Sequence, residues 1–80
     1  MLFSVTGSGV IRLRKLRNGD MAVAGIGKSD LVDIINRLCV GERAYWHHGY
    51  GEWVIKASHL QEAFEDLNRL AIPLERIMPR

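Results

Sequence analysis

Residues 10–26 read VIRLRKLRNGDMAVAGI, two alternating runs on either side of the dipeptide Asn18-Gly19. Asn-Gly is the strongest short-range signal for a β-hairpin, because both central residues of a type I′ turn need a positive φ angle. The sequence therefore predicts strands over residues 10–16 and 21–26 that are joined by a two-residue loop. In the resulting register, Leu16 pairs with Met21, Arg14 with Val23, and Leu13 with Ala24.

That register assigns the two faces of the hairpin, because side chains alternate across a strand. One face is predicted to pack into the core, and it holds Ile11, Leu13, Ala22, Ala24 and Ile26. The opposite face holds Arg12, Arg14, Leu16, Met21 and Val23. A further strand over residues 2–6 precedes the hairpin, after which Gly7 and Gly9 mark a turn.

A first amphipathic helix is predicted over residues 30–40. Ser29 is its expected N-cap, and Gly41 follows its end. The apolar residues recur at i, i+3, i+4, i+7 and i+8, which places them on one helical face. They are Leu31, Ile34, Ile35, Leu38 and Cys39.

A second sheet-then-helix unit follows. Residues 44–56 predict another hairpin with a glycine-containing loop. The pattern from Ser58 to Gln61 is a capping box, and a second amphipathic helix is expected over residues 59–70. Residues 74–78 fit either a last strand or a short helical turn, and the sequence leaves that choice open.

The expected order is β-β-β-α-β-β-α. Two helices with one apolar face each must cover one face of a mostly antiparallel sheet. The sequence thus predicts one small domain over residues 1–80, an α+β two-layer sandwich with both helices on one face of the sheet.

Composition limits the class of protein. The chain has 80 residues, of which 48% are hydrophobic and 25% charged, as in ordinary globular domains. The formal net charge of +2 permits contact with nucleic acid without requiring it. Cys39 is the single cysteine, which excludes a disulfide within one chain and fits a reducing compartment. No apolar run approaches the ~18 residues of a membrane span, and no signal-peptide pattern opens the chain, so we expect a cytoplasmic protein without membrane contact.

Residues 22–29, AVAGIGKS, nearly match a phosphate-binding loop, with Ala22 in place of the first glycine. Such a loop belongs to a doubly wound parallel sheet that also supplies an acidic strand end for magnesium. A short chain built from hairpins does not provide that setting. We interpret the segment as a glycine hinge, a solvated Lys28 and an N-cap, and leave open a weak anion site at the helix start.

The remaining chemistry-bearing residues match no catalytic or metal pattern. The three histidines and Cys39 lack the spacing of zinc ligands, and Cys39 falls on the apolar helix face. No serine sits in a nucleophile elbow. We therefore predict no catalytic residue, no metal and no cofactor, and a protein that is not an enzyme.

Charge and aromatic residues indicate a contact surface instead. Basic residues cluster in the first hairpin, and no acid precedes Asp20. A second cluster surrounds the second hairpin loop, where large rings can contact a partner, stack on bases or fill a thin core. The candidate partner or nucleic-acid contacts are Arg12, Arg14, Lys15, Arg17, Trp46, His48 and Tyr50.

The stretch over residues 32–70 resembles the HARP domain, an accessory module of annealing helicases. The matching pattern is a helix, an aromatic hairpin with Tyr45-Trp46 and a returning Glu52-Trp53-Val54-Ile55, and a second helix. The resemblance covers about half of the chain and transfers no functional residue. It implies contact with DNA or with a DNA-handling assembly.

By type, the chain is similar to the small α+β inhibitors that phages and mobile elements carry, including anti-CRISPR proteins. The first expectation is accordingly an inhibitor that docks on a host nucleoprotein complex and blocks its nucleic-acid or partner site. The alternatives are a small DNA- or RNA-binding module that uses the basic hairpin and the aromatic loop, and a self-associating structural subunit. A monomer and a small homo-oligomer both fit the sequence.

Overall fold

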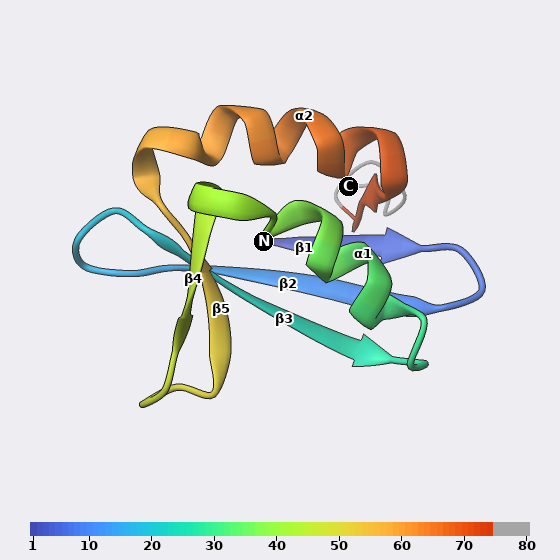
Figure 1. Cartoon of the computed structure of the whole chain (residues 1–80). Coiled ribbons are helices and arrows are strands. Elements are labelled where there is room, and N and C mark those ends of the chain that lie inside the picture. Colours follow the sequence, from blue (N-terminus) through green and yellow to red (C-terminus); the bar gives the residue numbers. More distant parts are fainter. Residues whose placement is uncertain (75–80) are drawn as a thin grey trace.

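The computed structural model describes residues 1–74 of the chain. Within them, six strands form one antiparallel sheet in the order β4-β5-β3-β2-β1-β6 (Figure 1). The strands are β1 (Leu2–Val5), β2 (Gly9–Lys15), β3 (Met21–Gly27), β4 (Ala44–His47), β5 (Glu52–Ile55) and β6 (Ile72–Pro73). The helices are α1 (Leu31–Leu38) and α2 (Leu60–Leu70), each next to a short 3₁₀ turn, η1 (Gly41–Arg43) and η2 (Ala57–His59).

Both helices lie over the same face of the sheet (Figure 1). The opposite face carries no helix from residues 1–74 and is named here the helix-free face. This arrangement confirms the predicted α+β class, the two layers and the order β-β-β-α-β-β-α. Strand β6, which pairs with β1, was not predicted.

The hydrophobic core lies between the helices and the sheet. Its most deeply buried large side chains are Ile11, Leu38, Ile55 and Leu67, which come from β2, α1, β5 and α2. Each helix therefore faces the sheet with the apolar stripe that its spacing predicts. Cys39 belongs to this core as a small apolar residue, as its place in the pattern indicated.

The turn between β2 and β3 differs from the predicted type I′ loop. Gly19 has a φ of 92°, whereas no residue other than glycine has a positive φ in residues 1–74, so Asn18 does not adopt the required angle. The Leu16 N–H donates to the Asp20 carbonyl at 2.8 Å, and the Gly19 N–H donates to the Leu16 carbonyl at 3.1 Å. These bonds define a three-residue loop that ends in a left-handed glycine, the next most common hairpin connection.

The longer loop shifts the register by one residue, so the predicted faces of the second strand of the hairpin are wrong. Because the side-chain period of a strand is two, a one-residue slip exchanges the faces of one strand. Strand β2 keeps its predicted faces, but Met21 and Val23 are buried in the core, while Ala24 and Ile26 lie on the helix-free face. The observed pairs are Lys15 with Met21, Arg14 with Ala22, Leu13 with Val23 and Arg12 with Ala24.

Both predicted helix starts are also wrong in detail. The N-cap of α1 is Asp30 rather than Ser29, and it makes no side-chain cap hydrogen bond. At α2 the predicted capping box is replaced by η2, which contains Ser58, and His59 is the N-cap. Backbone bonds of the preceding tight turns take the place of hydroxyl caps, as in the Val32 N–H to Ser29 carbonyl bond at 3.0 Å.

The structure bears on two further predictions, the form of the C-terminal segment and the absence of a membrane span. The question whether residues 74–78 form a strand or a helix falls, beyond Leu74, outside the described residues. In the described part of the chain, no helix has the length and apolar character needed to cross a membrane.

Candidate functional site

Two arginines of β2 lie on the helix-free face. Ile11 and Leu13 point into the core, so the alternating Arg12 and Arg14 point away from the helices. Both arginines are exposed.

Two side chains of β4 reach the same face. The strand pairings form a row from Arg14 through Ala22 and Val54 to Tyr45. Ala22 and Val54 are fully buried in the middle of this row, between the two long side chains at its ends. His47 lies two residues beyond Tyr45 and shares its face, so the second hairpin adds rings to the arginine strand.

Arg14 connects the two hairpins directly. Its guanidinium carbon lies 5.0 Å from the centre of the Tyr50 ring, within the range of a cation–π interaction. Its Nη2 atom lies 3.8 Å from Oε1 of Glu52. The Tyr50 ring stacks on His47 with centroids 4.0 Å apart and planes 14° apart. The Tyr50 N–H also donates to Nδ1 of His47 at 3.0 Å, which holds the β4–β5 turn in place.

Asp20 links the first hairpin to Tyr45 and to the backbone after β5 through two hydrogen bonds, which we call the Asp20 brace. Its Oδ2 accepts the Tyr45 hydroxyl at 3.2 Å, and its Oδ1 accepts the Ala57 N–H at 2.8 Å. Partial burial and the bond to Asp20 raise the pKa of the Tyr45 hydroxyl above its ordinary value. Asn18 completes the brace, since its Nδ2 donates to Oδ2 of Asp20 at 3.1 Å.

A shallow cavity of about 420 Å³ lies where the two hairpin turns meet. Its lining comes from both hairpins, namely Lys15, Leu16, Arg17, Asn18, Tyr45, His47 and Tyr50. We define the basic–aromatic surface as the cationic and aromatic residues around this cavity together with the two β2 arginines. Its members are Arg12, Arg14, Lys15, Arg17, Tyr45, His47 and Tyr50.

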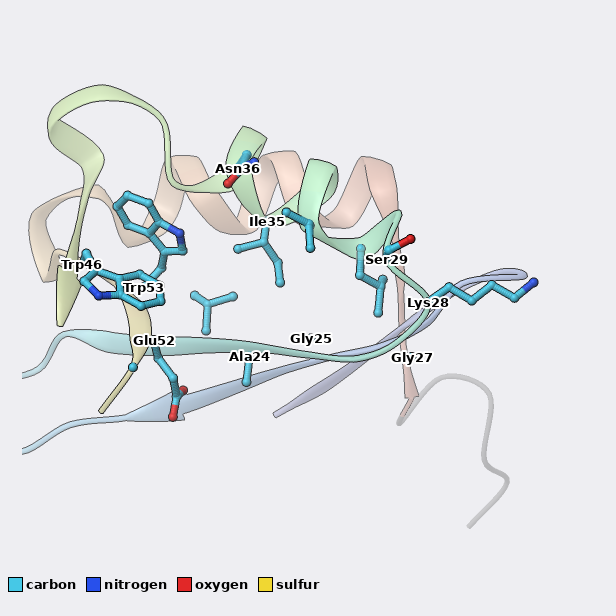
Figure 2. Close-up of a pocket in the computed structure, with 14 residues that line it drawn as sticks. Ala24, Gly25, Gly27, Lys28, Ser29, Ile35, Asn36, Trp46, Glu52 and Trp53 are labelled. Carbon is cyan, nitrogen blue, oxygen red and sulfur yellow. The ribbon is translucent and has the colours of Figure 1, made fainter. Parts of the chain in front are cut away.

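The structure separates two predicted contact residues from this surface. Trp46 alternates with Tyr45 and His47 and therefore lies on the helical side, where it contacts Trp53 edge to face with centroids 5.6 Å apart (Figure 2). His48 is exposed in the β4–β5 turn and does not line the cavity between the hairpins. Sequence reasoning missed Tyr45 and His47, although strand alternation on either side of Trp46 could have identified them.

The segment that resembles a phosphate-binding loop is a strand. Residues 22–27 belong to β3 and pair with β2, so this backbone is extended rather than curled around an anion. Lys28 and Ser29 follow at the rim of a groove beside α1 (Figure 2). Lys28 is exposed, as expected, whereas Ser29 is not the N-cap.

Other reactive groups are sparse in the described residues. Residues 1–74 hold no cluster of three or more His, Cys, Asp or Glu side chains placed to bind a metal ion. Burial raises the pKa of the Cys39 thiol to about 11, which disfavours the reactive thiolate.

Comparisons of the chain with known protein families, with curated proteins and with solved structures found no match. The resemblances to the HARP domain and to small phage-borne inhibitors accordingly stay predictions, and any function must be inferred from the residues themselves.

Proposed function

We propose that the protein is a non-enzymatic binding protein that holds single-stranded nucleic acid on its basic–aromatic surface. The observation that carries this proposal is that the basic strand and the aromatic turn, far apart in the sequence, meet through Arg14 and Tyr50. A groove that combines cations for phosphates with rings for bases is typical of proteins that bind single strands without strong sequence preference.

The cations of this surface suit phosphates. Arg12, Arg14, Lys15 and Arg17 are all exposed, and Tyr50 and Glu52 lie beside the Arg14 guanidinium. An arginine fork of this kind donates two parallel hydrogen bonds to a phosphate.

The rings of the surface suit nucleotides. Tyr50 is 51% exposed; its ring already stacks on His47 and lies under the Arg14 guanidinium, so a base would contact the part of the ring that these two neighbours leave exposed, with the Tyr45 hydroxyl beside it. The small net charge of the chain, +2, points to modest affinity. We expect dissociation constants of about 10⁻⁴ to 10⁻⁶ M at physiological salt, the range of non-specific nucleic-acid binding.

The test is fluorescence anisotropy with labelled oligothymidine, oligouridine and a duplex of equal length, at about 50 and 200 mM salt. The proposal predicts binding that prefers the single strands and weakens as salt rises. Arg12→Gln combined with Arg14→Gln should reduce the salt slope by about 0.7 for each phosphate that the variant no longer neutralises. Tyr50→Leu should weaken single-strand binding about tenfold, because leucine cannot stack on a base.

A matched control removes the same charge from the helical layer. Arg37→Gln combined with Arg69→Gln changes two exposed arginines of α1 and α2 and should leave binding unchanged. Equal losses in both double variants would contradict the proposal, because a general charge effect would then explain the binding. Absence of binding to every oligonucleotide at low salt would also overturn it and favour the docking of this surface on an acidic protein.

A further inference from the structure

Half of one edge of β3 has no strand partner within residues 1–74. Strand β5 pairs with β3 only at Met21, Ala22 and Val23, although β3 continues to Gly27. Residues 24–27 thus belong to a central strand by sheet order and still present a free edge.

The backbone groups of that edge can be identified from the strand pairing. The Lys28 N–H donates to the Ser8 carbonyl at 2.8 Å, and groups on an antiparallel strand alternate in direction. Residues 24, 26 and 28 therefore direct their N–H and C=O groups to β2. The same alternation directs those of Gly25 and Gly27 toward the free edge, with Gly27 at the strand end at a φ of 144°. Both glycines are exposed, so these four groups are open to a ligand.

The free edge forms the floor of a groove of about 490 Å³ (Figure 2). Helix α1 forms one wall with Leu31, Val32 and Ile35, and Trp46 and Trp53 close one end. Val32 is 56% exposed and Trp46 is 43% exposed, so a large part of this apolar wall faces solvent.

The edge also lacks the devices that normally protect a free strand. Proteins protect such edges with charged side chains, prolines or bulges. Residues 24–27 read Ala-Gly-Ile-Gly, with no charge and no proline, and they pair with β2 in unbroken register. An unprotected edge inside an apolar groove is the arrangement by which peptide-binding domains add a strand to a sheet.

We propose that this groove binds an extended segment of a partner protein, which adds to β3 as a short antiparallel strand. The segment residues opposite Gly25 and Gly27 would exchange hydrogen bonds with them and point their side chains toward α1. Aliphatic side chains at those two positions fit the wall made by Val32, Ile35 and Trp53.

Charge sets the polarity of the segment. Lys28 lies at one end of the groove, and Glu52 lies at the other, where its carboxylate points to the helix-free face (Figure 2) and pairs with Arg14. An antiparallel segment therefore carries an acidic residue at its N-terminal end, beside Lys28, and a basic residue at its C-terminal end, whose side chain points to the helix-free face as that of Glu52 does. A symmetric contact between the β3 edges of two copies is disfavoured, because each edge is recessed beside its own α1.

The probe is the peptide acetyl-Gly-Glu-Val-Thr-Leu-Lys-Gly-amide, which places Val and Leu opposite Gly27 and Gly25. Two-dimensional NMR of the labelled protein should show peptide-dependent shifts of the Gly25 and Gly27 amides and slower hydrogen exchange there. N-methylation of the Val and Leu nitrogens removes the donors to β3 and should weaken binding at least about tenfold. N-methylation of the Thr and Lys nitrogens, which point away from β3, is the matched control and should leave affinity within about twofold.

A pair of protein variants tests whether the α1 wall of the groove contacts the peptide. Val32→Glu places a charge in the groove, whereas Val40→Glu changes an equally exposed valine outside it, with exposures of 56% and 58%. Only the first should abolish peptide binding. Three results would overturn the proposal: no shift of the two glycine amides at millimolar peptide, equal effects of the two N-methylated peptides, or a free protein that dimerises with these amides already protected.

Discussion

The Arg14 guanidinium lies over the Tyr50 ring at 5.0 Å, and this contact joins the second strand of the sheet to the turn between the fourth and fifth. Arg14 is also paired with Glu52, next to the same turn. Cations and rings that are 36 positions apart in the sequence thereby form one surface. The proposed nucleic-acid binding depends on this convergence more than on the net charge of the chain.

The brace at Asp20 should be needed for this surface to keep its shape. Asp20→Ala removes the acceptor for the Tyr45 hydroxyl and for the Ala57 N–H. We expect a loss of about 1–3 kcal/mol in the free energy of unfolding, because the part-buried Tyr45 hydroxyl is left without its acceptor and the exposed Ala57 N–H loses its hydrogen bond. Urea unfolding measures this free energy, and Glu65→Ala, which changes an exposed residue of α2, is the control variant. Equal stability of the two variants would show that Asp20 does not brace the hairpins.

Asp66 links stability to pH. The hydrogen bond from Arg43, with Nη1 to Oδ2 at 2.7 Å, and the neighbouring Arg69 lower the pKa of Asp66. A lowered folded-state pKa stabilises the fold above the usual aspartate value of about 3.9, and this contribution is lost as pH falls through the folded-state pKa. Asp66→Asn should therefore lower the Tm at pH 7, and the difference from the wild type should disappear in strong acid. A Tm difference that persists unchanged in acid would contradict this assignment.

The Cys39 thiol should be inert while the protein is folded. Its side chain is buried, and its pKa of about 11 leaves very little thiolate at neutral pH. A thiol-specific reagent at pH 8 should label the folded protein slowly and label it fully in denaturant. Rapid labelling without denaturant would mean that the end of α1 opens easily.

The core face of α1 can be tested by truncating its side chains. Leu38 is 1% exposed, so Leu38→Ala should lower the free energy of unfolding by about 2–5 kcal/mol through reduced burial and the cavity left behind. Val40→Ala, at an exposed position just beyond α1, should change it by no more than about 0.5 kcal/mol. Similar losses in both variants would show that the apolar stripe is not the packed face.

Local sequence signals predicted the elements of this fold well. The apolar spacing around Leu38 and Leu67 identifies both helices, and the alternation from Ile11 to Leu13 identifies the core face of β2. These signals succeed because each depends on the period of a single element. Helix ends were less predictable, since backbone bonds of preceding tight turns replaced the side-chain caps that Ser29 and Ser58 suggested.

The register of the first hairpin could not be predicted from Asn18-Gly19 alone. The dipeptide fits both a two-residue loop and a three-residue loop with glycine last, and the two differ by one residue. Burial decides between them, because the observed loop places Met21 and Val23 in the core instead of the smaller Ala22 and Ala24. Large side chains in the core gain more from burial than alanines.

The site was only partly predictable for the same reason. The charge pattern identifies the basic residues of β2, but residue type alone does not say on which face of a strand a ring lies. Residue type places Trp46 with the arginines, whereas in the structure it lies on the helical side with Trp53. The free edge of β3 depends on where β5 ends relative to β3, and no local pattern in the sequence contains that information.

The most direct test of the proposed function is an NMR titration of the isotope-labelled protein with an unlabelled single-stranded oligonucleotide at low salt. We predict that the largest shifts fall on the basic–aromatic surface, above all at Arg12, Arg14, Tyr45 and Tyr50, and that they shrink as salt is added. Shifts confined to α1 and α2, or no shift at any amide, would contradict nucleic-acid binding by this surface.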